Sequence, residues 1–274
     1  MKYKLIVSDI DGTLVDDNQN VSSHTKKQVH AFIESGGIFT LATGRIEEAT
    51  KRFYNKLNLQ HPAILYNGAK IVNLSNRKTY FNSQLEKEHT YTAFKLLKEL
   101  PLAAMAYRGG NIYVSHINKV VESYMKKDGV NCIEVGDLSS YFKEPPTKIL
   151  IIGEDRLLDD FAQKYKSVCN IKPNTVKSEH SYLEILPLGI SKGSALEKLC
   201  TILKINLDET IAIGDHLNDI DMIKRAGLGV AMENAHPLVK EAADHICLSN
   251  EKEGVADIVG KVLAMGQIAT NRKK

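Results

Sequence analysis

The segment LIVSDIDGTL, residues 5–14, begins with an apolar run and ends in acidic, glycine and hydroxyl residues. A short apolar run followed by polar turn residues is typical of a buried strand that leads into a loop. Asp9 and Asp11 lie two positions apart, so their side chains face the same way while the chain stays extended. Two neighbouring carboxylates repel each other unless a cation or a proton lies between them. The segment therefore predicts a strand whose carboxyl end carries charged chemistry.

Strand-like and helical runs alternate through the first and last parts of the chain. Outward from the first strand, they are expected at residues 23–35, 38–42, 46–57 and 63–66, and again at 194–204, 210–213, 217–226, 228–231, 237–243, 245–248 and 255–263. This alternation predicts a parallel sheet with right-handed crossovers, in which residues 63–66 supply the third strand.

The middle of the chain has a different pattern. A hairpin is expected at residues 69–81, and a Gly109-Gly110 turn joins two further strand-like runs. The remaining runs are typical of an α+β segment with an antiparallel sheet. The helices and strands of this segment are expected at residues 86–99, 103–107, 112–114, 118–127, 148–152, 155–166 and 182–186.

The simplest account of these patterns is an α/β fold with an inserted domain. We expect a doubly wound, Rossmann-like parallel-sheet core that is formed by residues 1–83 and 188–274. Residues 84–187 are expected to form the inserted α+β domain.

The composition excludes several classes of protein. Of the 274 residues, 43% are hydrophobic and 25% are charged, which is the balance of a globular protein. The 36 Lys and Arg residues nearly balance the 33 Asp and Glu residues, which argues against a nucleic-acid binder or a disordered chain. We expect no membrane span, because no run of roughly 18 apolar residues occurs. The first apolar run is also too short for the core of a signal peptide.

The four cysteines are far apart and form no CxxC pair. They are Cys132, Cys169, Cys200 and Cys247. This spacing disfavours a disulfide framework or a zinc site, so we expect a cytoplasmic protein.

Polar groups follow several of the expected strands, and ligands bind at the carboxyl ends of the strands in a doubly wound sheet. These groups are Asp9, Asp11, Gly12 and Thr13; Thr43, Gly44 and Arg45; Gly214, Asp215, Asn218 and Asp219; and Lys192, just before the helix at 194–204. The carboxylates Asp9, Asp11 and Asp215 form an oxygen-rich set that suits Mg²⁺. A helix dipole and the Lys192 cation would both favour phosphate.

Each of these motifs alone has a simpler interpretation. The Asp9–Thr13 segment can be a polar turn, Thr43-Gly44 a tight turn, and Lys192 a solvated lysine. Asp215 can cap a helix, and we expect His216 to be an exposed loop residue without a role. Only the combination, placed at one edge of a sheet by independent strands, favours a ligand site.

The combination resembles a known family. Asp9-Ile10-Asp11-Gly12-Thr13-Leu14, Thr43-Gly44-Arg45, Lys192 and Gly214-Asp215-x-x-Asn218-Asp219 are similar, in this order, to motifs one to four of the haloacid dehalogenase superfamily. The insertion lies between Asn67-Gly68 and the Lys192 motif. This position resembles that of the large α/β cap, type IIB, in the Cof-type subfamily.

The resemblance implies a role for each motif residue. Asp9 is then the nucleophile that forms an aspartyl-phosphate, and Asp11 is the general acid and base. Mg²⁺ is then held by Asp9, by the Asp11 backbone carbonyl and by Asp215. The expected phosphate-binding groups are the Ile10 backbone N–H, Thr43, Gly44, Lys192 and Asn218. Arg45, Asn67 and Asp219 are expected to support the site or to face the substrate.

The implied function is Mg²⁺-dependent hydrolysis of small phosphorylated metabolites, with sugar phosphates as the default class. In the family that the chain resembles, phosphatases carry an acid at the position of Asp11 and dehalogenases lack one, so the resemblance implies phosphate-ester hydrolysis over carbon–halogen cleavage. Two alternatives stay open: a phosphomutase that uses the same Asp9, and a non-catalytic phosphate-sensing protein. We expect no nucleic-acid or membrane partner and a monomer, with a weak dimer as the alternative. The polar candidates for specificity in the insertion are Arg108, Asn111, Tyr113, Lys119, His180 and Glu184.

Overall fold

A five-stranded parallel sheet forms the centre of the first lobe in the computed structural model, which describes residues 2–264. In spatial order its strands are β14 (His245–Ile246), β13 (Leu228–Ala231), β12 (Thr210–Gly214), β1 (Leu5–Ser8) and β2 (Ile38–Leu41). All four neighbouring pairs are parallel. The expected Rossmann-like core is therefore confirmed, and β1 lies between two other strands.

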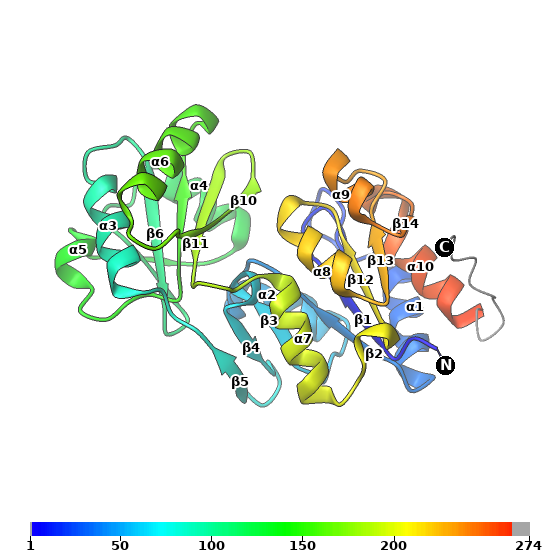
Figure 1. Cartoon of the computed structure of the whole chain (residues 1–274). Coiled ribbons are helices and arrows are strands. Elements are labelled where there is room, and N and C mark those ends of the chain that lie inside the picture. The colour runs from blue at the N-terminus through cyan, green and yellow to red at the C-terminus, as the bar shows by residue number, and fades with distance from the viewer. Residues whose placement is uncertain (1, 265–274) are drawn as a thin grey trace.

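Helices cover both faces of this sheet (Figure 1). The helices of this lobe are α1 (Ser23–Glu34), α2 (Glu47–Lys56), α7 (Lys192–Leu203), α8 (Ile220–Arg225), α9 (Pro237–Ala242) and α10 (Gly254–Ala264). Ile6 of β1 belongs to the apolar cluster that contains residues of α1 and α10. Leu5 and Val7 belong to a second cluster, with residues of α7 and α8. Successive side chains of a strand point to opposite faces, so an unbroken apolar strand suits a sheet covered twice.

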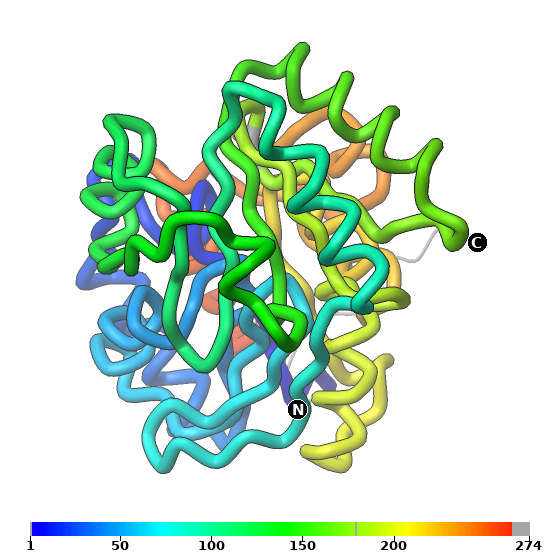
Figure 2. The backbone as a smooth tube through the Cα atoms, turned by 90° about the vertical axis from the view of Figure 1, so that its left-hand side faces the viewer, coloured from blue at the N-terminus to red at the C-terminus, as the bar shows by residue number. Residues whose placement is uncertain are grey.

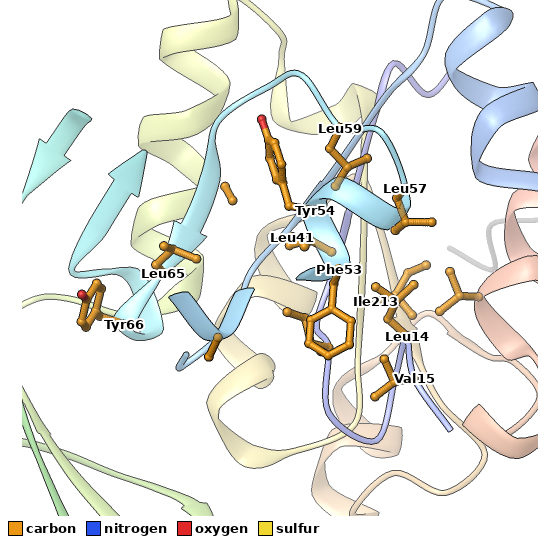
Figure 3. Packing of buried hydrophobic residues seen from close by; sticks show 14 of the residues in the cluster. Leu14, Val15, Leu41, Phe53, Tyr54, Leu57, Leu59, Leu65, Tyr66 and Ile213 are labelled. Carbon is orange, nitrogen blue, oxygen red and sulfur yellow. The ribbon is translucent and has the colours of Figure 1, made fainter. Parts of the chain in front are cut away.

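The apolar face of α2 joins the larger cluster. Figure 3 shows Phe53 of α2 near Leu14, Val15 and Ile213, all of which are buried. Burying a side chain of this size contributes about 1.5–3 kcal/mol relative to its exposure. This packing fixes the chain directly after the loop that follows β1.

The strand at residues 63–66 does not join the parallel sheet as expected. Instead β3 (Ala63–Leu65) pairs with β4 (Lys70–Val72), which pairs with β5 (Thr79–Asn82), both antiparallel. One isolated parallel bridge, Ala42 to Ile64, links β3 to the segment after β2. The cause is the 3₁₀ turn Tyr66–Gly68, whose three residues have positive φ angles of 52°, 54° and 105°. This turn reverses the chain at once, so β4 takes the hydrogen bonds of β3.

A six-stranded sheet forms the second lobe. In spatial order its strands are β10 (Asn174–Glu179), β11 (Tyr182–Leu186), β9 (Lys148–Ile152), β6 (Ala103–Arg108), β7 (Asn111–Val114) and β8 (Cys132–Glu134). Its pairs are antiparallel except for β7 and β8, which are parallel. The antiparallel α+β character is confirmed. The edge strands β8 and β10 and the short helix α5 (Leu138–Tyr141) are additional to the expected elements.

The two faces of this second sheet differ. Figure 2 shows α3 (Lys87–Leu97) beside α6 (Asp155–Val168), and both share an apolar cluster with Ile149 and Ile185 of the sheet. Tyr124 of α4 (Lys119–Asp128) belongs to the cluster of the opposite face. The chain passes between the lobes twice, from β5 to α3 and from β11 to α7. None of the described helices combines the length and the apolar character that a membrane span requires.

We predict that Gly68→Ala destabilises the protein far more than Gly109→Ala. Both glycines have positive φ, a strain of about 1–2 kcal/mol for an L side chain. A Cβ at Gly68 would also lie 2.2 Å from the Ser191 carbonyl oxygen, whereas one at Gly109 meets open space. Such overpacking adds typically ~1–3 kcal/mol. Urea unfolding measures both losses, and equal losses would contradict this assignment.

Candidate active site

Asp9 is the first residue beyond β1 and is almost completely buried, at 5% exposure. Its backbone N–H donates to the Ile213 carbonyl of β12, at 2.9 Å. The neighbouring Ile10 has a fully buried side chain, and its carbonyl accepts the N–H of Leu14 at 2.9 Å. These bonds continue the sheet for one residue and then close a tight turn. They hold the Asp9 carboxylate at the carboxyl edge of the sheet.

Lys192 connects two carboxylates from different segments. Its Nζ donates to Asp9 Oδ1 at 2.7 Å and to Asp219 Oδ1 at 2.6 Å. The Lys192 side chain is fully buried. Lys192 is the first residue of α7, and Ser191 caps this helix. Burial acts to lower the pKa of Lys192, but the charges and hydrogen bonds of Asp219 and Asp9 outweigh it and raise that pKa. The ammonium therefore stays charged and balances part of the acidic cluster.

Asp219 is held by the turn in which it lies. Its Oδ2 accepts the backbone N–H groups of Asp215 and His216, each at 3.0 Å. Because Oδ1 already accepts from Lys192, both oxygens of Asp219 have partners. Asp219 therefore supports the cluster and positions Lys192.

Three carboxylates of this cluster lie close enough to share a cation. One oxygen from each of Asp9, Asp215 and Asp219 lies within 4.8 Å of the others. Asp215 Oδ1 accepts from the Thr13 hydroxyl at 2.7 Å. When ionised, three carboxylates and one ammonium leave two net negative charges, which a divalent cation would balance. Asp9 and Asp215 are the better ligands, because the oxygens of Asp219 are already engaged.

Burial and the repulsion between carboxylates raise the pKa values of two members of this cluster. Burial raises the pKa of Asp215 to about 7, with the Asp219 charge as the next cause. Burial is also the largest cause that raises the pKa of Asp9 well above its usual range, and the charges of Asp219 and Asp215 add to it. Both shifts favour the protonated carboxyl groups over the charged ones. The donor set thus fits a hard divalent cation with oxygen ligands.

The Asp11 carboxylate is not among the three that could share a cation, and it pairs with Arg45. Arg45 Nε donates to Asp11 Oδ2 at 2.7 Å, and Nη2 donates to Oδ1 at 2.6 Å. Gln19 Nε2 also donates to Oδ1, at 3.0 Å. Burial would raise the pKa of Asp11, but the hydrogen bonds and charge of Arg45 outweigh it and lower that pKa. The pairing of Arg45 with Asp11 is a geometry that the sequence alone did not reveal.

Hydrogen bonds link the loop after β2 and the Asn218 turn to Asn67, which lies in the turn after β3. The Thr43 hydroxyl accepts the Arg45 backbone N–H at 3.1 Å, and the Thr43 carbonyl accepts that of Asn67 at 3.0 Å. Asn218 Nδ2 donates to Asn67 Oδ1 at 2.9 Å. Asn67 Nδ2 and Asn218 Oδ1 are buried without a hydrogen-bond partner. Unpartnered buried amide atoms are costly, so this side of the site is suited to a polar ligand.

A cavity of about 380 Å³ lies between the two lobes, over the carboxyl edge of the parallel sheet. Its core-side lining includes Asp9, Asp11, Thr43, Gly44, Arg45, Asp215 and Asn218. The lining also includes His216, which is half-buried and therefore not the exposed residue that we expected. Burial lowers the pKa of His216.

The second lobe contributes charged and aromatic side chains to this cavity. They are Tyr124, Lys127, Asp128, Lys148, Tyr182 and Glu184. Among the six polar candidates from the insertion, only Glu184 is in this lining. Lys148 was missed because it begins a strand-like run, where a terminal lysine looks like an ordinary solvent-facing residue. The available signal was that Lys148 and Leu150 lie two positions apart on β9 and therefore face the same side of the sheet.

Carboxylates around a buried ammonium, within a cavity that two lobes enclose, are typical of an enzyme acting on a small polar substrate. Residues 6–259 match the sequence model of the haloacid dehalogenase-like hydrolases. The chain belongs to this family, which confirms the family expected from the sequence.

Relatives of known name and structure agree with this assignment. The 5-amino-6-(5-phospho-D-ribitylamino)uracil phosphatase YcsE of Bacillus subtilis is 30% identical over 256 residues, or 93% of this chain and 94% of the relative. A haloacid dehalogenase-like hydrolase from Bacteroides thetaiotaomicron is 31% identical, with a TM-score of 0.86 over 95% of this chain and 99% of that chain. The subclass IIB sugar phosphatase BT4131 shares the fold, with a TM-score of 0.84 at 21% identity, over 97% and 100% of the chains. These findings support an enzyme of the phosphatase class.

We predict that Lys192→Met strongly destabilises the protein at neutral pH in EDTA. The change leaves two buried carboxylates without their cation, and breaking a buried pair in this way costs about 3–5 kcal/mol. Lys252→Met is the matched control, because Lys252 pairs with Glu233 while 63% exposed. Exposed pairs contribute only about 0–1 kcal/mol. Similar urea midpoints for the two variants would contradict the central role of Lys192.

Proposed function

We propose that this hydrolase is a Mg²⁺-dependent phosphatase for small phosphorylated metabolites, such as sugar phosphates, and that it works through an aspartyl-phosphate. The observation that carries the proposal is the Asp9 carboxylate, which is buried against Lys192 and lines the cavity. A carboxylate fixed in this way is an established kind of covalent phosphoryl acceptor. The names of the relatives support the same chemistry.

Asp9 would attack phosphorus, so that a new oxygen–phosphorus bond forms and the bond to the leaving oxygen breaks. Asp11 would give a proton to the leaving alcohol and then take one from the water that hydrolyses the intermediate. Inorganic phosphate leaves and the Asp9 carboxylate is restored. The Arg45 pair favours the ionised form of Asp11, which takes the proton from water. To serve the leaving alcohol, Asp11 would first have to leave this pair and bind a proton.

The phosphate oxygens would be held by groups around Asp9. The Ile10 backbone N–H, the Thr43 hydroxyl, the Gly44 N–H and the Asn218 amide are the proposed donors. The buried, unpartnered Asn218 Oδ1 supports some reorientation of that amide when a ligand enters. Lys192 donates hydrogen bonds to Asp9 and Asp219. We therefore propose that it acts mainly by fixing the position of the nucleophile and balancing its charge.

Mg²⁺ would be held by Asp9, by the Asp11 backbone carbonyl and by Asp215. Bound there, the ion would offset the repulsion between the carboxylates and the phosphate. The excess negative charge at Asp9 and Asp215 supports this assignment. Asp219 would remain outside the ligand set, since Lys192 and two backbone N–H groups occupy its oxygens.

The insertion, which we propose spans residues 84–187, would act as a cap. Its side chains form one wall of the cavity, opposite the carboxylates of the core. Closing such a wall excludes water and lets the remote part of a substrate contribute to binding. Glu184 is the insertion candidate best placed for this contact.

The direct test of the reaction is phosphate release from a panel of phosphorylated metabolites and p-nitrophenyl phosphate. We expect wild-type release that requires Mg²⁺ and stops in EDTA. Asp9→Asn removes the nucleophile while keeping its shape, so we expect release to fall by at least ~10⁴-fold. Asp16→Asn is the matched control, since Asp16 also lines the cavity but has no proposed role. Normal release by a folded Asp9→Asn variant would refute the proposal.

A further inference from the structure

A lysine and a glutamate of the second lobe are buried where that lobe meets the core. Lys148 of β9 and Glu184 of β11 have side chains only 3% and 4% exposed, and Lys148 Nζ donates to Glu184 Oε2 at 2.8 Å. Both lie on the sheet face that turns away from α3 and α6, because Ile149 and Ile185 occupy the other face. A buried ion pair often adds little to stability. The position of this pair, at the junction of the lobes, therefore suggests a functional role.

The Lys148 ammonium also reaches across to the core. It donates to the Gly44 carbonyl oxygen at 2.7 Å, between residues 104 positions apart in the chain. The pair with Glu184 lies within one lobe, whereas the bond to Gly44 joins the two lobes. Separation of the lobes would break the bond to Gly44 and leave the ion pair intact. The bond is therefore a contact that only the closed arrangement can make.

This contact fixes the peptide group between Gly44 and Arg45 at both ends. Its carbonyl accepts from Lys148, and its N–H donates to Thr43 Oγ1 at 3.1 Å. Because that N–H uses a lone pair of the Thr43 hydroxyl, the hydroxyl proton remains to be donated to an anion. The second lobe lies close against this loop, since a Cβ on Gly44 would lie only 3.2 Å from Glu184 Oε1.

We propose that Lys148 is a positioning residue, which orients the Thr43–Arg45 loop for phosphate when the second lobe docks on the core. The inference rests on the phosphate site of the proposed function and adds a residue of the second lobe to it. Lys148 acts through the Gly44–Arg45 peptide and not on the leaving group. Loss of Lys148 should therefore weaken the binding of every phosphorylated ligand, and of inorganic phosphate, by a similar factor.

Calorimetric titration of inorganic phosphate into the full chain with Mg²⁺ tests this without turnover. Lys148→Met removes the ammonium, and we expect phosphate affinity to fall roughly tenfold or more, as for a hydrogen bond to a charged group. Lys148→Arg keeps a donor and should restore part of the affinity. Lys98→Met is the matched control from the same lobe, because Lys98 pairs with Asp137 while 52% exposed. We expect this control to bind phosphate as the wild type does.

A double variant addresses folding, because Lys148→Met alone leaves Glu184 buried without its partner. Lys148→Met with Glu184→Gln removes that charge and should show the same loss of affinity. Unchanged phosphate affinity in either folded variant would overturn the inference.

The kinetic readout separates positioning from direct substrate contact. We expect kcat/KM to fall by similar factors for p-nitrophenyl phosphate and for the best metabolite. A loss confined to the metabolite would place Lys148 on the leaving group and overturn the inference. A wild-type chain that binds phosphate without hydrolysing any ester would refute the proposed function alone, and the titrations would still decide the role of Lys148.

Discussion

The burial of one ammonium between two carboxylates is the interaction on which the site depends. Lys192 lies at the start of α7, while its partners Asp9 and Asp219 follow β1 and β12. The contact therefore joins the segment before the insertion to the segment after it. Removing Lys192 leaves two buried carboxylates without their cation, which a fold of ordinary stability tolerates poorly. The same contact keeps Asp9 at the cavity wall.

Electrostatics also link the two lobes. The core presents an acidic cluster that Lys192 balances only in part. Burial raises the pKa values of Asp9 and Asp215, and the charges of neighbouring carboxylates add to this effect. The Asp11 carboxylate is paired with Arg45. The second lobe adds a buried lysine, whose bond to Gly44 reaches the loop beside Asp9. The cavity thus combines a site for a cation with groups that donate to an anion.

Much of this arrangement was predictable because short stretches of sequence determine it. Two apolar strands, β1 and β12, are each followed by a carboxylate, so Asp9 and Asp215 lie at the same edge of the parallel sheet. The antiparallel pairing of β3 was missed, although Asn67-Gly68 is a dipeptide that favours positive φ angles and tight turns. The positive φ angle of Tyr66, which is unusual for a bulky residue, completes the reversal. Lys148 was missed for a different reason, because its partner Gly44 lies 104 residues away.

The most direct test of the account is mass spectrometry of the chain after acid quenching during turnover of its best substrate with Mg²⁺. The account predicts a phosphoryl group on the peptide that contains Asp9, present during turnover and absent without substrate. Turnover with that peptide unmodified, or with the phosphoryl group on another residue, would contradict the role of the buried Asp9 carboxylate as nucleophile.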